Sequence, residues 1–187
     1  MKRTNKRIIL VGCGGSGKDF LARALSDSGL IKDVSLTTRK PRGNEVPGYD
    51  YNYISDEEFV QLMERGHFYE CVKFGNSRYG TAQSAWDHAD VFIQNPSGIK
   101  SIRPEDRGDC VVVFLDIPEH IRAERMLMRK EEDGSFFTED KVKKRIADDK
   151  KDFMGFTDFD FFIKDPSFSA DEWISILKGA ITIKEKV

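Results

Sequence analysis

The sequence predicts an α/β fold in which a parallel β-sheet is covered by helices on both faces. Short runs of β-branched and other apolar residues alternate along the chain with segments of helical periodicity. These runs are apolar throughout, which is typical of strands that are buried on both faces. The length of 187 residues suits one domain with an insertion and excludes two independent domains.

The expected elements begin with a strand at 8–11 that stops at Gly12, followed by a helix that ends at Gly29. Further buried strands are expected at 90–94, 110–115 and 160–163. Two serines are each followed three positions later by Glu, a capping box that predicts helix N-caps at Ser55 and Ser169.

Two segments differ in composition from this alternating pattern. Residues 36–88 are rich in Tyr, Arg, Gly and Asn with short strand-like pieces, which predicts a small mixed α/β insertion. Residues 125–154 are almost all helix formers, broken at 133–135, which predicts a helix, a loop and a second helix. We therefore expect a single domain of residues 1–187, with the insertion at 36–88, the helical segment at 125–154, and the core at 1–35, 89–124 and 155–187.

Composition excludes several classes of protein. Hydrophobic residues make up 39% of the chain and charged residues 33%, which argues against a disordered chain and against a membrane protein. The net charge of −2 gives no positive field for nucleic acid, so no nucleic-acid or membrane partner is expected. The three cysteines are scattered and form no Cys-x-x-Cys pair, which disfavours a disulfide framework and a zinc site. A cytoplasmic setting is expected.

The sharpest local motif lies between the first strand and the first helix. It reads Gly-Cys-Gly-Gly-Ser-Gly-Lys over 12–18 and matches G-x-x-x-x-G-K, a loop whose backbone N–H groups surround a phosphate. Its Lys18 is expected to reach the outer phosphates of a bound nucleotide. The motif indicates a three-layer P-loop NTPase fold. The predicted ATP-binding residues are Gly12, Cys13, Gly14, Gly15, Ser16, Gly17, Lys18 and Asp19.

Asp19 departs from the motif, because Ser or Thr normally follows the lysine and binds Mg²⁺ through its hydroxyl. A carboxylate is a good ligand for a hard cation, so Asp19 is the candidate metal ligand and Mg²⁺ bound with ATP is the expected cofactor. An equally weighted and compatible interpretation is an acidic residue that stabilises the helix N-terminus.

The insertion carries groups suited to a second substrate. Arg39 and Arg42 lie three apart beside turn residues and make a fork for a phosphate dianion, and tyrosines add hydroxyl donors. The carboxylate of Glu70 can accept two N–H groups from one edge of a base. Guanine, with its N1–H and its exocyclic amine, fits that requirement.

From Ile8 to about Ile181 the sequence resembles the guanylate kinase family. The segments T-T-R-x-P-R, G-x-D-Y and Y-G-T, which begin at Thr37, Gly48 and Tyr79, carry this resemblance. It implies that the phosphate of GMP is bound by Arg39, Arg42, Tyr51 and Tyr79, and that guanine is read by Ser35, Glu70 and Thr81. It also implies that residues 125–154 form a lid whose Arg125, Arg129 and Arg145 neutralise charge on the transferring phosphoryl group, together with Lys18.

One strand departs from the family. The family's Asp-x-Asp falls on Ile93 and Asn95, so the carboxylate expected to support the metal is absent. Asn95 can still hydrogen-bond a nucleotide, and our hypothesis is that Asp19 replaces the missing carboxylate. The combination of G-K-D with this Asn is also similar to the ribose 1,5-bisphosphate phosphokinases, which leaves a sugar phosphate as an alternative acceptor.

The resemblance implies the reaction ATP + GMP → ADP + GDP, with dGMP as a second acceptor. A second alternative is a guanylate-kinase-like module that binds protein without catalysis. Such modules tend to lose the phosphate loop or the lid arginines, whereas Lys18, Arg125 and Arg129 are present here. The expected partners are the small molecules ATP and GMP or dGMP, and the chain is expected to be a monomer or a homodimer.

Overall fold

The larger of two sheets is parallel, in a computed structural model that describes residues 5–43, 45–129 and 136–182. Its strand order is β6-β1-β7-β8. In that order the strands span Val91–Gln94, Arg7–Gly12, Cys110–Leu115 and Phe161–Ile163. The central strand β1 pairs with β6 through Val11 and Gln94, and with β7 through Gly12 and Leu115. The predicted strands and their parallel arrangement are confirmed.

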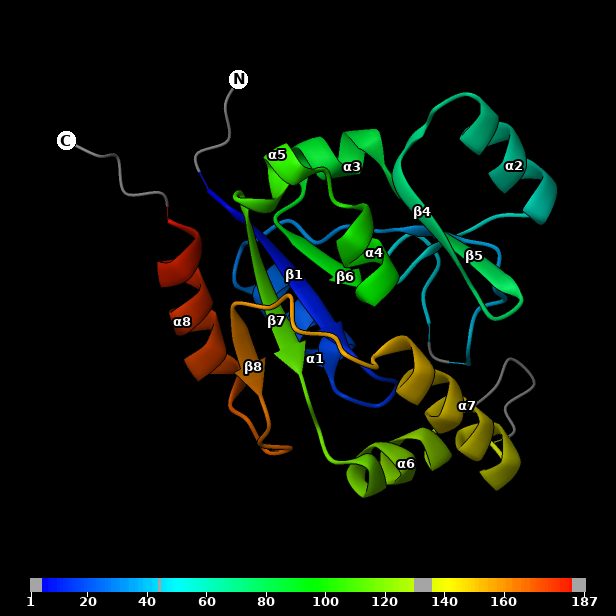
Figure 1. Cartoon of the computed structure of the whole chain (residues 1–187), viewed down its shortest axis with the longest axis vertical. Coiled ribbons are helices and arrows are strands. Elements are labelled where there is room, and N and C mark those ends of the chain that lie inside the picture. Colours follow the sequence, from blue (N-terminus) through cyan, green and yellow to red (C-terminus); the bar gives the residue numbers. More distant parts are fainter. Residues whose placement is uncertain (1–4, 44, 130–135, 183–187) are drawn as a thin grey trace.

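Helices cover both faces of this sheet, as continuous apolar strands predict. One face packs against α1 (Lys18–Asp27) and α8 (Ala170–Ile181), which contribute Leu21 and Leu177 to the core. The other packs against α3 (Gln83–His88) and α4 (Pro96–Ser101), which contribute Trp86 and Ile99. Figure 1 shows α8 beside β8 and the green helix α4 beside β6.

The smaller sheet lies inside the predicted insertion. Its order is β3-β2-β5-β4, with strands at Asn52–Tyr53, Leu36–Thr37, Ser77–Ala82 and Phe68–Phe74. Helix α2 (Asp56–Glu64) begins with the predicted capping box, since Ser55 and Glu58 each accept from the other's backbone N–H. At α8 the Ser169 hydroxyl accepts from the Glu172 N–H, so this N-cap is confirmed as well. The insertion boundaries stay a prediction.

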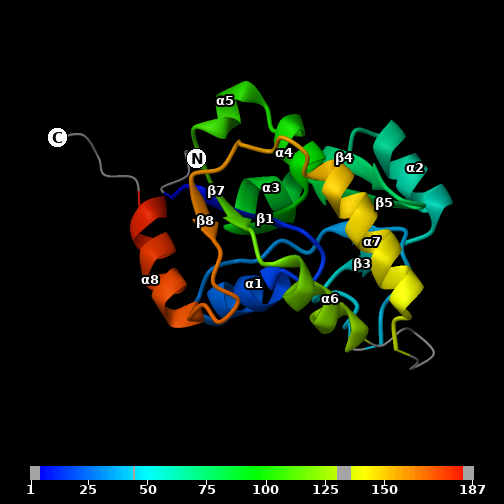
Figure 2. The same ribbon diagram turned by 60° about the horizontal axis from the view of Figure 1, so that its bottom comes forward.

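The remaining helices lie on either side of β7 in the chain. A short helix α5 (Pro104–Arg107) precedes that strand, and α6 (Glu119–Leu127) and α7 (Glu139–Asp152) come after it. Figure 2 shows α6 and α7 side by side, with α7 reaching toward β4 and β5. The predicted break at 133–135 lies outside the described residues. In the described part of the chain, no helix has the length and apolar character needed to cross a bilayer.

Candidate active site

A cleft opens where the carboxyl ends of β1 and β6 meet the insertion sheet and the helices α6 and α7. Open parallel sheets bind ligands at this edge. Its walls include these predicted site residues: Gly12, Gly14, Gly15, Ser16, Gly17, Lys18, Asp19, Ser35, Arg39, Arg42, Tyr51, Glu70, Tyr79, Asn95, Arg129 and Arg145. Three others, Cys13, Thr81 and Arg125, lie behind the walls and hydrogen-bond to residues in them. The structure thus brings the residues predicted to bind ATP and those predicted to bind GMP to one cleft.

The loop at 12–18 has the backbone of a phosphate-binding turn. Gly15 and Gly17 have φ values of 80° and 96°, a left-handed region that side chains other than Gly rarely adopt. At Gly12 a Cβ would lie 2.7 Å from Ser16 Oγ and 2.8 Å from the Leu115 carbonyl oxygen. Glycine is required at these three positions, and the loop ends on the N-terminus of α1, where backbone N–H groups favour an anion.

Lys18 folds back over this loop. Its Nζ donates to the carbonyl oxygens of Gly12 at 2.7 Å and Cys13 at 3.0 Å. Burial lowers the pKa of Lys18 to about 8, although the charge of Asp19 acts in the opposite direction. A phosphate anion placed beside the ammonium would favour its charged form. Lys18 is therefore held inside the loop, ready to pair with a phosphate group.

Asp19 stands exposed in the first turn of α1 and lines the cleft. Over the described residues, no three His, Cys, Asp or Glu side chains gather in a group that could hold a metal ion. Mg²⁺ is usually held by one or two carboxylates together with substrate phosphates, and an exposed carboxylate directly after the phosphate loop fits that donor set. Asn95 lies nearby in the cleft wall, where its Oδ1 accepts from the Gly98 N–H and caps α4.

The insertion places two guanidinium groups around one carboxylate. Arg39 donates to both oxygens of Glu45, at 2.7 and 3.0 Å, and Glu45 also accepts from the backbone N–H of Arg42 at 2.8 Å and from the Tyr53 hydroxyl at 2.7 Å. The Arg42 side chain lies 3.8 Å from the same carboxylate. Its pKa is lowered by burial and by the neighbouring cations Arg39 and Arg129. Glu45 was given no role from sequence, yet it holds both arginines of the fork.

The far end of the cleft holds a buried polar cluster. Glu70 Oε1 accepts from the Thr81 hydroxyl at 2.8 Å and from Gln94 Nε2 at 2.8 Å, and Gln94 Nε2 lies 3.1 Å from Thr81 Oγ1. Glu70 Oε2 is buried without a hydrogen-bond partner among the described residues. Burial raises the pKa of Glu70, whereas the donors on Gln94 and Thr81 lower it. One oxygen of this carboxylate is thus available to N–H groups of a ligand.

A second buried carboxylate lies behind Ser35. The Ser35 hydroxyl donates to Asp33 Oδ2 at 2.5 Å, and Asp33 is only 6% exposed. Burial raises the pKa of Asp33 to about 6, while the hydrogen bond from Ser35 lowers it. Ser35 therefore faces the cleft with its hydroxyl oriented by a neighbour two residues away.

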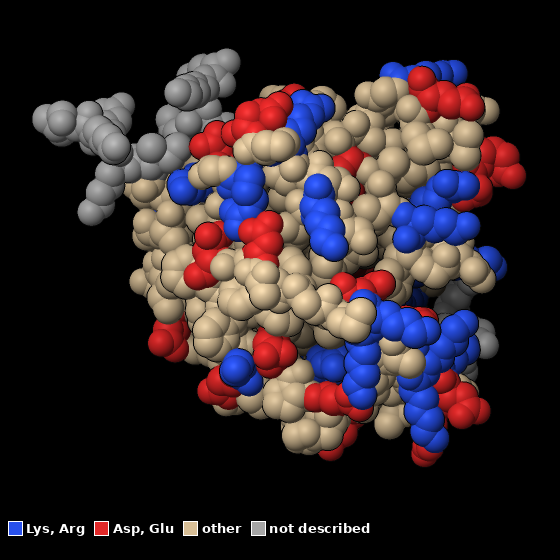
Figure 3. All heavy atoms as spheres, viewed as in Figure 1, with Lys and Arg blue, Asp and Glu red and all other residues tan. Residues whose placement is uncertain are grey.

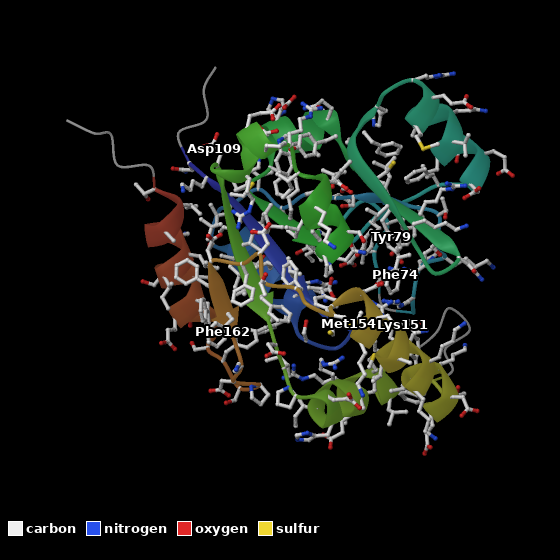
Figure 4. The ribbon with its side chains drawn as sticks, viewed as in Figure 1. Phe74, Tyr79, Asp109, Lys151, Met154 and Phe162 are labelled. Atoms are coloured by element: carbon white, nitrogen blue, oxygen red, sulfur yellow. The ribbon has the colours of Figure 1, made fainter. Side chains whose placement is uncertain are left out.

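The three arginines of the predicted lid have two kinds of surroundings. Arg129 and Arg145 line the cleft, and the Arg145 guanidinium lies 4.3 Å from the ring centroid of Phe74 on β4. Figure 4 shows Phe74 and Tyr79 pointing from the β4–β5 hairpin toward α7. Arg125 instead donates to the carbonyl oxygens of Gly15 and Pro166, at 3.2 and 2.6 Å. Its predicted contact with the phosphoryl group stays a prediction, since here it supports the loop from behind.

Sequence reasoning missed Asp149 on α7. Its side chain is 1% exposed, and its Oδ2 accepts from the Gly14 N–H at 2.7 Å and lies 3.5 Å from Arg122 Nη1. Its Oδ1 lies 3.0 Å from Arg145 Nε. Asp149 follows the buried Val142 by seven positions, so both lie on one helix face, and that spacing could have revealed its burial. The carboxylate ties α7 to the phosphate loop.

Comparisons with known proteins agree with this geometry. The guanylate kinase family model matches residues 4–183. The guanylate kinase of Malacoplasma penetrans is 31% identical over 204 residues, covering 99% of this chain and 100% of that relative. That of Helicobacter pylori is also 31% identical, covering 93% and 87%. A solved guanylate kinase from Anaplasma phagocytophilum has a TM-score of 0.66 at 20% identity, covers 98% of this chain and 89% of that one, and supports the fold alone.

Proposed function

The chain belongs to the guanylate kinase family, and from that premise we propose that it transfers a phosphoryl group from ATP to GMP, giving ADP and GDP. The observation that carries this proposal is the single cleft that joins the phosphate loop to the open carboxylate of Glu70. The first would hold the donor, and the second would recognise guanine in the acceptor.

The acceptor would bind along the insertion wall. Its phosphate would meet Arg39 and Arg42, which Glu45 already holds side by side, together with the hydroxyls of Tyr51 and Tyr79. The guanine N1–H and amine would donate to Glu70, while Ser35 and Thr81 complete the base pocket. Because these contacts are made to the base and the phosphate, dGMP is a proposed second acceptor.

Catalysis in this proposal is positioning and charge neutralisation. An oxygen of the GMP phosphate attacks the γ-phosphorus of ATP, and the bond to the β–γ bridging oxygen breaks with its electron pair leaving on ADP. No general base is needed, because the attacking oxygen is already anionic. Lys18, Arg129 and Arg145 lie in the cleft wall, where their charges would stabilise the transferring group.

Asp19 is the residue that would hold Mg²⁺ beside the ATP phosphates, and the ion would neutralise part of their charge. The exposure of Asp19 and its place in the cleft wall, directly after the phosphate loop, support this assignment. A cytoplasmic setting and a monomeric or homodimeric state also belong to the proposal.

The test is an ADP-release assay with Mg²⁺ and ATP in which GMP, dGMP, AMP, CMP, UMP and ribose 1,5-bisphosphate are compared as acceptors. We expect turnover with the two guanine nucleotides alone. Turnover confined to the sugar bisphosphate would overturn the proposal in favour of the sister family. Absence of turnover with every acceptor would overturn it in favour of a binding module.

A further inference from the structure

We propose that Gln94 is a positioning residue for base recognition, which orients the carboxylate of Glu70 by donating to its Oε1. This inference rests on the proposed function, because it concerns how the same cleft reads guanine. Gln94 is the last residue of β6, in the core sheet, whereas Glu70 and Thr81 belong to the insertion sheet. Its side chain is therefore the hydrogen-bonded link between the two sheets at the base pocket.

The hydrogen bonds fix which oxygen of Glu70 faces a ligand. Gln94 Nε2 and the Thr81 hydroxyl both donate to Oε1, each at 2.8 Å. Thr81 lies directly opposite Glu70 in the pairing of β4 with β5, so its donor comes with the sheet register. Gln94 adds a second donor from a different layer. With Oε1 occupied in this way, Oε2 is left for the base, and it has no protein partner within the described ranges.

The side chain of Gln94 is itself held in one orientation. It is 8% exposed and lies against Gly98 in the first turns of α4. A Cβ at position 98 would collide with Gln94 Oε1, so only Gly leaves room for the amide there. Because the oxygen packs against Gly98, the NH₂ end is directed toward Glu70 and Thr81. The amide is thus prearranged as a donor to the carboxylate.

The electrostatic setting explains why a neutral donor matters at this position. Burial raises the pKa of Glu70, and the hydrogen bonds from Gln94 and Thr81 oppose that rise. The charge of Glu70 raises the pKa of Asp33, before β2, and of the Cys71 thiol on β4, so both of these neighbours are acids. The donors of Gln94 and Thr81 are the neutral groups that stabilise the carboxylate. Only the ionised carboxylate can accept both N–H groups of guanine.

The test replaces the amide while keeping the shape of the side chain. Q94M removes both polar atoms, and Q94N keeps an amide that is one methylene too short to reach Glu70. Q83M is the matched control, because Gln83 pairs with Asp87 and Arg103 on the surface. For each protein, KM and kcat are measured with GMP at saturating ATP from about pH 6 to about pH 8.5, and thermal unfolding checks the fold.

We expect Q94M and Q94N to raise KM for GMP about tenfold near pH 8, with kcat within about twofold of wild type. The ratio of variant to wild-type KM should grow several-fold toward pH 6, because the pKa of Glu70 rises when its donor is lost. GMP has its own phosphate pKa near 6, but it cancels in this ratio. Q83M should match wild type at every pH.

Three results would overturn the proposal: a KM ratio near one, a ratio independent of pH, or a loss confined to kcat. The test does not depend on a single variant folding, because Q94N and Q94M place a small polar and an apolar side chain at this position and differ in packing. A failure of the proposed function is distinguishable, because wild type itself would then show no turnover of GMP. In that case this inference falls with it.

Discussion

Two buried carboxylates stand at opposite ends of one cleft and have contrasting surroundings. Glu70, at the insertion end, is bonded by the neutral donors of Thr81 and Gln94, and one of its oxygens has no partner in the described structure. Asp149, at the phosphate-loop end, accepts from a backbone N–H and lies within 3.5 Å of Arg122 and 3.0 Å of Arg145. Asp149 Oδ1 also lacks a hydrogen bond, but it is ion-paired with Arg145, whereas Glu70 Oε2 has neither kind of partner in the described structure. In this sense Glu70 is the open carboxylate and Asp149 is the closed one.

The different surroundings indicate that one buried carboxylate serves ligand binding and that the other stabilises the fold. An unpartnered buried acceptor costs stability in the free protein, and a ligand with matching N–H groups removes that cost on binding. A buried carboxylate between two guanidinium groups has its charge balanced within the chain. Glu70 should therefore control substrate recognition, and Asp149 should control the attachment of α7 to the phosphate loop.

The largest expected effect comes from removing the open carboxylate. E70A should lower kcat/KM for GMP about 1000-fold, because two N–H groups of guanine lose their acceptor inside a buried pocket. KM for ATP should change less than about threefold. Steady-state kinetics with each substrate varied in turn measure both values. An equal loss for ATP and GMP would contradict the assignment of Glu70 to the base.

Removing the closed carboxylate should act on stability instead. D149A leaves the buried Arg122 without its acidic partner and should lower the free energy of unfolding by about 3 kcal/mol. E70A breaks no ion pair but leaves the buried donors of Gln94 and Thr81 without this acceptor, so it should cost less than D149A, about 1 to 2 kcal/mol. Urea unfolding of both variants makes the comparison. If E70A proved the less stable of the two, the contrast between the two carboxylates would be wrong.

A third carboxylate, the exposed Asp19, tests whether burial is what separates the two roles. D19A should leave the free energy of unfolding within about 0.5 kcal/mol of wild type, as surface substitutions usually do. It should lower Mg²⁺-dependent turnover about tenfold, because the ion beside the ATP phosphates would lose its protein ligand. Unchanged turnover across a Mg²⁺ titration would reject Asp19 as the metal ligand.

The smallest expected effect is a pH dependence of ATP binding at the phosphate-loop end of the cleft. Because the pKa of Lys18 is lowered to about 8 in the free protein, its ammonium form declines as the pH rises through that value. ATP should bind about fourfold more weakly at pH 8.5 than at pH 7. K18R, whose charge persists over this range, should show a flat profile. Calorimetric titration of ATP into both proteins measures the trend.

Helix α7, in the predicted lid, also carries a positively charged surface. Figure 3 shows Lys and Arg side chains gathered over α7, beside the cleft that would hold two anionic substrates. Several of these side chains are paired with acids, as in Lys143 with Glu139 and Lys150 with Glu119. Of the three arginines predicted for the lid, Arg129 and Arg145 line the cleft.

Local motifs allowed much of the fold and site to be predicted from sequence. The phosphate loop, the arginine fork and the strands each depend on neighbouring residues, so their spacing was informative. Gln94 and Asp149 were not found, because their partners are distant in the chain. Gln94 reaches Glu70 across 24 positions, and Asp149 reaches Gly14 across 135. Such contacts depend on how the sheets and helices pack against one another, and the periodicity of the sequence does not predict that packing.

The recognition of guanine by Glu70 is tested most directly by the ratio of the dissociation constants of AMP and GMP. This ratio is measured by calorimetry for wild type and for E70A. AMP lacks the N1–H and the 2-amino group, and so has nothing to donate to Glu70 Oε2. We expect a ratio of about 100 or more in wild type that falls to near one in E70A. A ratio that survives the loss of Glu70 would show that guanine is recognised elsewhere.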